Sequence, residues 1–163
     1  MIDITRGGRE LLDEIRPLWL ALRDHHHGVA PDFGPVRADD ESWRRRRAQY
    51  EQWLADERSF FLLARRGGHG IGYAFVRAEE IESPTWEKEG VSGVLETLSL
   101  LPEARGSGLG TRLVAQVRDE VAQWGHGQLV VTAVASNRDA IRFYEREGFT
   151  PAFLTFVSAP TRG

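Results

Sequence analysis

Three glycines at alternate positions mark the loop Arg105-Gly106-Ser107-Gly108-Leu109-Gly110. Glycine has no Cβ, so the backbone can turn sharply there and approach a ligand closely. An amphipathic, helix-like stretch follows, and the first amides of a helix have no partner inside it. Together with the helix dipole, such amides form an anion site that suits a pyrophosphate. The alternative is a tight turn that needs glycine for its geometry alone.

Two common nucleotide-binding motifs do not fit this loop. A Walker loop requires a lysine and then Ser or Thr after its last glycine, whereas Thr111 follows Gly110 directly. A dinucleotide fingerprint requires a further glycine three positions after Gly108, and Thr111 occupies that position. The loop therefore predicts a different kind of anion ligand.

The loop and the segments on both sides of it form a larger pattern. Arg105, Gly108 and Gly110 form Arg-x-x-Gly-x-Gly, which resembles the pyrophosphate-binding motif of the GNAT superfamily, the acyl-CoA-dependent N-acyltransferases. The run 137–149 resembles that family's Asn, Ala, Tyr and Gly-Phe pattern, and the run 96–102 leads into Arg105 as the family's fourth strand does. The resemblance covers 94–149, and two motifs at the right separation are more specific than either alone.

The resemblance implies acetyl-CoA as co-substrate and a place for it. The fourth strand should carry a bulge and splay from the fifth, so that the pantetheine arm bonds to free main-chain groups near Leu98 and Leu100. The implied CoA-binding residues are Leu98, Ser99, Leu100, Arg105, Gly106, Ser107, Gly108, Leu109, Gly110, Thr111 and Asn137. Core packing equally suits the two leucine side chains, and a plain helix N-cap equally suits Asn137.

Two residues are the catalytic candidates. Tyr144 matches the family's tyrosine, which lies beside the thiol sulfur as general acid, although its spacing alone suits a buried aromatic residue. Glu96 is the candidate general base, acting through water. Strand alternation places it on the face of Val94, Leu98 and Leu100 unless the bulge resets the register. Apolar neighbours there would make it a better base. A plain exposed residue, or an anchor for a cationic amine, is the alternative.

The elements that position these residues follow from hydrophobic spacing. We expect strands at 2–4, 59–65, 71–77, 94–101, 129–135 and 149–157, and helices at 11–24, 41–56, 106–124 and 137–147, with Pro17 starting a second helix or kinking the first. The strand-helix-strand order of 94–135 predicts two parallel neighbours. We therefore expect one α/β domain over 1–163, with a GNAT-like mixed, mostly antiparallel sheet of six to seven strands and helices on both faces.

Composition excludes several other classes of protein. The 163 residues include no cysteine, which removes thiolate nucleophiles and zinc-thiolate sites. A net charge of -3 gives no general attraction to nucleic acid or to anionic membranes. No apolar run approaches the roughly 20 residues of a membrane span, and the first residues lack signal-peptide features, so we expect a cytoplasmic protein. His25, His26 and His27 are consecutive and point about 100° apart on a helix, so we expect no metal site, although one of them could line the substrate cleft.

Two charged segments have open readings. The run 44–47 is all arginine, as in a nucleic-acid-binding patch, but Arg44, Arg45 and Arg47 each have an acidic residue four positions away, which favours a solvated helix. The acidic segment 79–89, which includes Trp86, either borders the acceptor pocket or is a solvated loop.

The sequence thus predicts an N-acetyltransferase that transfers an acetyl group from acetyl-CoA to a primary amine of a small molecule. Without cysteine, direct attack in a ternary complex is the expected route. The alternatives are a protein N-terminal or lysine acetyltransferase, or a non-catalytic acyl-CoA-binding sensor. The Phe-rich segment 149–157 suggests pairing across a homodimer.

Overall fold

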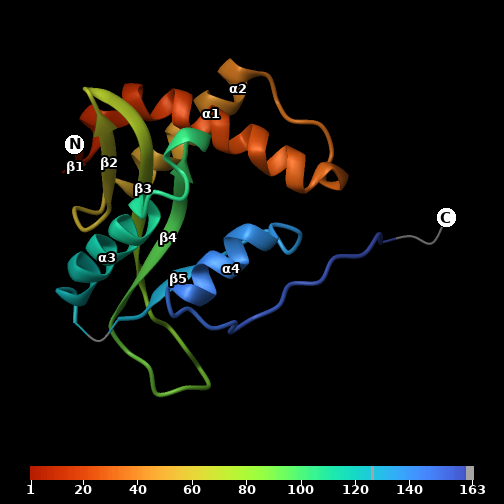
Figure 1. Ribbon diagram of the computed structural model, residues 1–163. Helices are drawn as coiled ribbons and strands as arrows, with labels where there is room; N and C mark the ends of the chain where they lie inside the picture. The colour runs from red at the N-terminus through yellow and green to blue at the C-terminus, as the bar shows by residue number, and fades with distance from the viewer. Residues whose placement is uncertain (126, 161–163) are drawn as a thin grey trace.

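A central sheet organises the computed structural model, which describes residues 1–125 and 127–160 (Figure 1). Its five strands are β1 (Ile2–Gly7), β2 (Phe60–Arg66), β3 (His69–Glu80), β4 (Val91–Leu100) and β5 (Leu129–Val131). They lie in sequence order across the sheet; the first three pairings are antiparallel, and β4 and β5 are parallel. The predicted mixed sheet and parallel unit are confirmed, whereas the described residues form five strands rather than six or seven.

Helices cover both faces of this sheet, as predicted. The helices are α1 (Leu12–Val29), α2 (Asp39–Trp53), α3 (Leu109–Ala122) and α4 (Arg138–Arg146), with short 3-10 turns at Arg9–Leu11, Pro31–Phe33 and Pro102–Ala104. One apolar cluster joins the sheet to α1 and α2 through Leu12, Ile15, Tyr50, Phe61 and Phe75. The other joins it to α3 through Leu109, Leu113, Val117 and Val121, and we call these the α1/α2 side and the α3 side.

Pro17 lies inside α1, which neither ends nor restarts there. Proline removes one intrahelical hydrogen bond. The buried Ile15 and Leu18 flank it and hold this part of the helix against the sheet, so packing compensates for the loss. None of the helices in the described ranges is long and apolar enough to cross a membrane.

The prediction of a final strand at 149–157 is wrong for the described chain. Residues 150–159 have no regular secondary structure and extend away from the body of the molecule (Figure 1). Phe153 and Phe156 are 93% and 86% exposed, and Leu154 and Val157 are similarly open. A strand needs a neighbour for its N–H and C=O groups, and this segment pairs with no strand among the described residues. For the same reason the predicted strand 129–135 is shortened to the three residues of β5, which pair with β4.

Candidate functional site

The candidate active site begins where β4 and β5 part. The parallel pairing joins Gly93, Val94 and Leu95 to Leu129–Val131 and goes no further. From Thr97 to Leu100, β4 is paired with β3 on one side only. The unpaired side offers main-chain N–H and C=O groups to a ligand, as an edge strand does. The bulge and splay that the resemblance implied are both present.

Glu96 is the bulged residue of β4. Phe75 pairs with Thr97 and Val76 pairs with Leu95, so the register skips Glu96. Its Oε1 accepts a hydrogen bond of 2.6 Å from Nε of Arg77, and both side chains are 22% exposed. The guanidinium of Arg77 lies 5.6 Å from the ring of Trp53 in α2, which places this ion pair on the α1/α2 side.

The bulge therefore corrects the expected environment of Glu96. Leu98 and Leu100 pack against the cluster on the α3 side, whereas Glu96 faces an arginine on the other. The expectation of apolar neighbours is wrong for this carboxylate. Its partner is the guanidinium of Arg77, on the α1/α2 side.

The side chains around the unpaired part of β4 are fixed. Ser99 is buried and its Oγ donates to the carbonyl of Leu18 at 3.4 Å. The carbonyl of Leu100 accepts from Nε of Arg105 at 3.2 Å. Arg105 thereby connects the end of β4 to the glycine loop, and Ser99 connects it to α1.

Two of the three loop glycines are required by backbone conformation. Gly106 has φ 71° and Gly108 has φ 79°, values that side chains disfavour, and a Cβ at either position would meet nothing within 4 Å. Gly110 has a different reason to be glycine. A Cβ there would lie 3.1 Å from the Phe143 ring of α4, so this glycine lets α3 and α4 approach closely.

The loop leaves a run of main-chain donors without partners. Arg105 N donates to Pro102 and Arg112 N donates to Gly108, but among the described residues no backbone acceptor is recorded for the amides of 106–111. The hydroxyl of Ser107 donates to the Ala104 carbonyl at 2.6 Å, and that of Thr111 donates to Glu147 at 2.6 Å. Free amides at the start of a 14-residue helix are suited to a diphosphate.

Tyr144 projects from α4 into the α3 side. Its ring packs edge-on against Phe143 and Phe149, with centroids 5.4 and 5.5 Å away. Burial raises the pKa of Tyr144 to about 12. Its hydroxyl is therefore protonated at neutral pH, which a general acid requires.

Asn137 caps α4. Its side-chain oxygen accepts a 3.3 Å hydrogen bond from the amide of Ala140, and the residue is 7% exposed. The N-cap reading is confirmed, and it fixes the start of the helix that carries Tyr144. Contact with the cofactor stays a prediction.

Sequence reasoning missed a polar network on the α1/α2 side. The hydroxyl of Tyr50 hydrogen bonds to those of Tyr73 and Thr97, at 3.0 and 2.7 Å. Nη2 of Arg46 donates to Thr97 at 2.8 Å. Thr97 follows Glu96 directly, so this network supports β4 at its bulge. Helical spacing placed Tyr50 and Trp53 on one side of α2, which was the available signal.

The helix reading of the arginine run is partly right. Arg45 pairs with Glu41 and Arg47 pairs with Glu51, each four residues apart. Asp40 instead pairs with Arg16 of α1 at 2.5 Å. Arg46 turns inward, so the run is not uniformly a solvated face.

The histidines lie at the end of α1, and His26 is partly buried near Arg46. Burial, helped by the charges of His25 and Arg46, lowers the pKa of His26. The imidazole is thus neutral at pH 7. Its position near Arg46 puts one histidine of the run on the side of Glu96.

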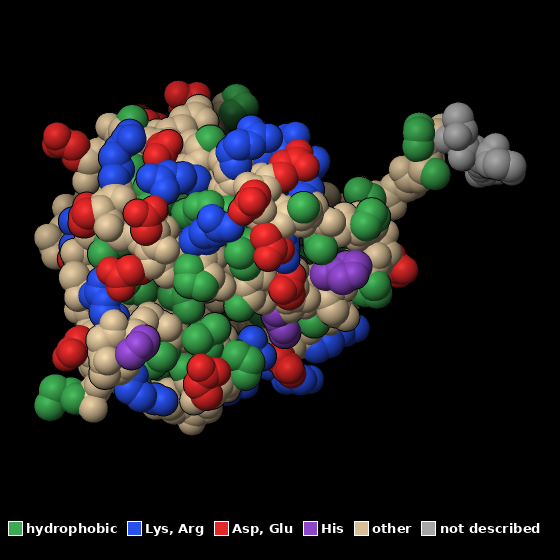
Figure 2. Space-filling view, turned by 90° about the horizontal axis from the view of Figure 1, so that it is seen from above, with side chains coloured by type: hydrophobic (Ala, Val, Ile, Leu, Met, Phe, Trp, Pro, Cys, Tyr) green, Lys and Arg blue, Asp and Glu red, His purple; other side chains and the backbone are tan. Residues whose placement is uncertain are grey.

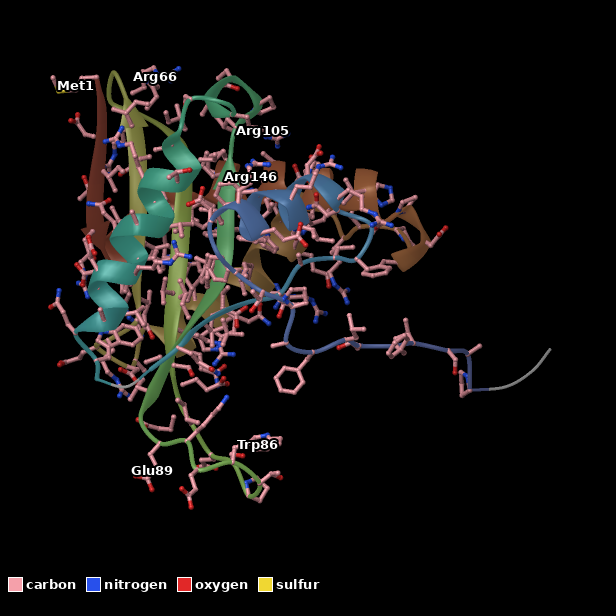
Figure 3. The ribbon with its side chains drawn as sticks, turned by 60° about the horizontal axis from the view of Figure 1, so that its bottom comes forward. Met1, Arg66, Trp86, Glu89, Arg105 and Arg146 are labelled. Carbon is pink, nitrogen blue, oxygen red and sulfur yellow. The ribbon has the colours of Figure 1, made fainter. Side chains whose placement is uncertain are left out.

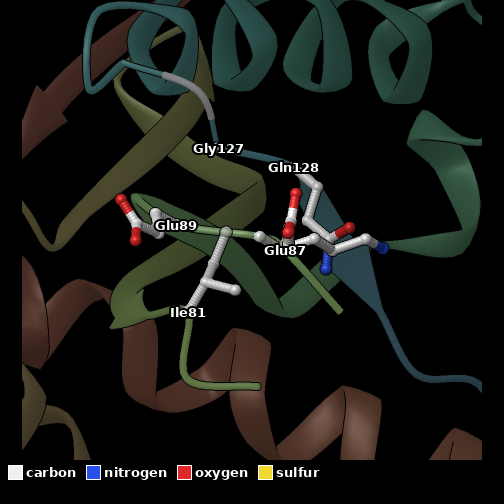
Figure 4. A pocket seen from close by; sticks show the side chains of 6 residues that line it. Ile81, Glu87, Glu89, Gly127 and Gln128 are labelled. Atoms are coloured by element: carbon white, nitrogen blue, oxygen red, sulfur yellow. The ribbon is translucent and has the colours of Figure 1, made fainter. Parts of the chain in front are cut away.

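The acidic segment forms its own hollow, away from the glycine loop. A cavity of about 740 Å³ is lined by Ile81, Glu87, Lys88, Glu89, Gly127 and Gln128 (Figure 4). Figure 3 shows Trp86 and Glu89 at the end of the sheet opposite to Arg105. The segment therefore lies beyond the closed end of the gap between β4 and β5, and a role in acceptor binding stays a prediction.

The splayed strands and the free amides have the arrangement that the resemblance to the acyl-CoA-dependent acyltransferases implied. The model of the acetyltransferase (GNAT) family matches residues 19–149 of the chain. The protein belongs to this family, which confirms the resemblance noted in the sequence.

Similar proteins include several acetyltransferases. A mycothiol acetyltransferase of Thermobispora bispora is 30% identical over 132 residues, which are 81% of this chain and 42% of that protein. An aminoalkylphosphonate N-acetyltransferase of Salmonella typhimurium is 29% identical over 107 residues, which are 65% of this chain and 66% of that protein. The chain thus spans about two fifths of the first relative and just under two thirds of the second.

A solved structure shares the fold. The aminoglycoside N-acetyltransferase AAC(6')-Iy in complex with CoA superposes with a TM-score of 0.70 and 18% identity, over 99% of this chain and 96% of that one. At this identity the likeness concerns the fold alone. The two chains therefore share the arrangement of strands and helices.

Proposed function

We propose that the protein transfers an acetyl group from acetyl-CoA to a primary amine of a small molecule, by direct attack in a ternary complex. The observation that carries the proposal is the continuity of two features. The unpaired side of β4 begins at the Glu96 bulge and leads through Arg105 to the free amides of the glycine loop. Pantetheine suits the first feature and the diphosphate suits the second.

The two proposed catalytic residues have complementary states. Tyr144 holds its proton at neutral pH and donates it to the departing thiolate. Glu96, paired with Arg77, accepts the proton of the amine through water or anchors the ammonium form before attack. They lie on opposite sides of β4, so the thioester and the amine approach the bulge from different faces.

The relatives support a small amine as acceptor. The two relatives and the solved structure are named as acetyltransferases of mycothiol, of aminoalkylphosphonates and of aminoglycosides. The alternatives are a protein acetyltransferase and a non-catalytic acyl-CoA sensor, and each predicts a different result in the following test. Acetyl-CoA is the co-substrate of the proposed route.

The test combines binding and turnover. Calorimetry of the intact chain with acetyl-CoA should give saturable heat, and thiol release should rise with one or more members of a panel of small amines. Acetylation of peptides alone would transfer the proposal to protein substrates. Binding without thiol release from any amine would indicate a sensor, and no binding would refute the proposal.

The proposal includes a homodimer held by the C-terminal segment. Figure 2 shows this segment projecting from the body with apolar side chains along it. Phe153 and Phe156 of this segment are 93% and 86% exposed, and β5 is an edge strand of the sheet that the described residues form. A second copy offers both a strand edge and an apolar surface.

Light scattering of the intact chain should give twice the monomer mass. Replacing Phe153 and Phe156 by serine should return the mass to that of a monomer. Phe33→Ser is the matched control, because Phe33 is 78% exposed elsewhere in the molecule. A wild-type monomer at high concentration would contradict the dimer without affecting the enzymatic proposal.

A further inference from the structure

The side chain of Arg46 is enclosed by aromatic rings. Its Cζ lies 4.5 Å from the ring centroid of Trp19, 4.6 Å from that of Tyr50 and 5.3 Å from that of Trp53. Cation–π contacts of this kind stabilise a guanidinium while excluding water from its faces. The group is therefore held in one orientation and partly desolvated.

The edges of this guanidinium are incompletely used. Nη2 donates to Thr97 at 2.8 Å and Nη1 donates to Gln49 at 3.2 Å, whereas Nε is buried without a partner. Arginine carries five N–H donors, so these two hydrogen bonds leave other N–H groups of the guanidinium available to a ligand. Arg46 also has no ion pair with a carboxylate in the described ranges, although Arg45 and Arg47 on either side of it do.

Desolvation and the lack of a counter-ion favour an external anion. A cation removed from water and held only by neutral groups gains more from an opposite charge than a solvated cation does. A guanidinium fork matches carboxylate, phosphate and phosphonate oxygens. The neighbouring Arg77 is different, because its guanidinium already forms ion pairs with the carboxylates of Glu79 and Glu96, with N–O distances of 2.9 and 2.6 Å.

Arg46 lies beside the proposed base. Its partner Thr97 is the residue after Glu96, and the ring of Trp53 is near both Arg46 and Arg77, at 5.3 and 5.6 Å. The partly buried His26 lies close enough to respond to the charge of Arg46. A short molecule with its amine at Glu96 would thus bring a group a few bonds away to Arg46.

We infer that Arg46 is the anion-binding subsite of the acceptor pocket, so that the acceptor is an amine that also carries a carboxylate, phosphate or phosphonate. This inference rests on the proposed function for the position of the amine. The Trp19, Tyr50 and Trp53 rings keep the fork rigid, and Glu96 receives the amine at the other end of the same molecule.

Matched acceptor pairs test the subsite by activity. The pairs are β-alanine with β-alaninamide, and aminoethylphosphonate with its diethyl ester. The wild type should favour the anionic member of at least one pair by about tenfold or more in kcat/KM, the factor expected for one hydrogen bond to a charged group. Preference for carboxylate or for phosphonate identifies the anion, and equal use of both members in each pair would overturn the inference.

Variants then assign the preference to Arg46. Arg46→Met keeps much of the stem and should lower the preference for the anionic over the neutral acceptor, measured as the ratio of their kcat/KM values, about tenfold or more. Arg46→Lys keeps the charge without the fork and should lie between. Arg44→Met, an exposed change on the same helix, is the control. Equal losses for both acceptors in Arg46→Met and Arg46→Lys would assign the residue a purely structural role and refute the subsite.

A binding measurement separates this inference from the proposed function. Propylphosphonate and butyrate are titrated calorimetrically into the intact chain loaded with CoA, with propanol as the neutral comparison. At least one anion should bind, and Arg46→Lys should weaken it about tenfold. If no amine is acetylated, the proposed function fails but anion binding still supports the subsite. Absence of anion binding to the wild type overturns the subsite even if amines are acetylated.

Discussion

Gly108 and Gly68 offer a matched pair of substitutions that separates backbone strain from ligand binding. Gly108 has φ 79° in the loop before α3, and Gly68 has φ 82° in the turn between β2 and β3. A Cβ at either position would meet no atom within 4 Å. Replacing either by alanine therefore changes only the backbone preference, which costs about 1–2 kcal/mol of folding free energy in both cases.

The two variants should differ in their affinity for acetyl-CoA. Alanine at position 108 disfavours the φ that aims the amides of the loop, so at least two hydrogen bonds to the diphosphate are lost. At about 1.5 kcal/mol for each bond to a charged group, the dissociation constant should rise by roughly 150-fold. Gly68→Ala leaves these amides untouched, and its affinity should stay within about threefold of the wild type.

Urea unfolding gives the free energy of unfolding of each variant, and calorimetry gives its affinity for acetyl-CoA. Equal losses of unfolding free energy in the two variants establish that the strain is matched, and the affinities are then compared at a temperature where both are folded. If Gly108→Ala binds acetyl-CoA as tightly as Gly68→Ala does, the loop amides do not bind the diphosphate. The reasoning from the loop to the function would then be wrong.

Three further predictions follow from single contacts. Burial holds the pKa of Tyr144 at about 12, so the kcat of the wild type should show no loss from ionisation of this tyrosine near neutral pH. In steady-state kinetics, Tyr144→Phe should lower kcat by about 10²-fold or more and change the affinity for acetyl-CoA little. The pKa of His26 is lowered on folding, so the unfolded chain takes up the proton first; unfolding free energy should fall as pH decreases from about 7 to about 5. His26→Gln should flatten that slope in urea titrations, and an unchanged slope would assign it elsewhere. Gly110→Ala should cost about 1–3 kcal/mol because its Cβ lies 3.1 Å from Phe143, and Phe143→Leu in the same chain should recover part of the loss in thermal unfolding.

The parts of the fold that were predicted are those that depend on residues close together in the sequence. The α3 stripe of Leu113, Val117 and Val121, the glycine conformations at 106 and 108, and the Asn137 cap each depend on a few consecutive residues. The spacing of the side chains is enough to specify them, because their partners lie within one turn of helix or one loop.

The parts that were not predicted depend on partners far away in the chain. The inward position of Arg46 requires Thr97 and Trp19, which the four-residue spacing along α2 does not reveal. The segment 150–159 has the apolar side chains of a strand, but a strand also needs a free edge beside it. The strand propensity of the residues accounts for the side chains, whereas the free edge depends on the tertiary structure.

The Glu96 bulge explains how β4 presents different side chains to the two sides of the sheet. Leu95 belongs to the buried cluster on the α3 side, and Leu98, three residues later, packs against the same cluster. In a regular strand an odd separation places side chains on opposite faces. The extra residue restores both leucines to the α3 side and leaves Glu96 with Arg77 on the α1/α2 side. The same residue ends the pairing with β5, since the parallel register stops at Leu95. A single extra residue in β4 thus lies where the pairing with β5 ends and turns a carboxylate to the α1/α2 side, so the proposed thioester site and the proposed amine site meet at this position.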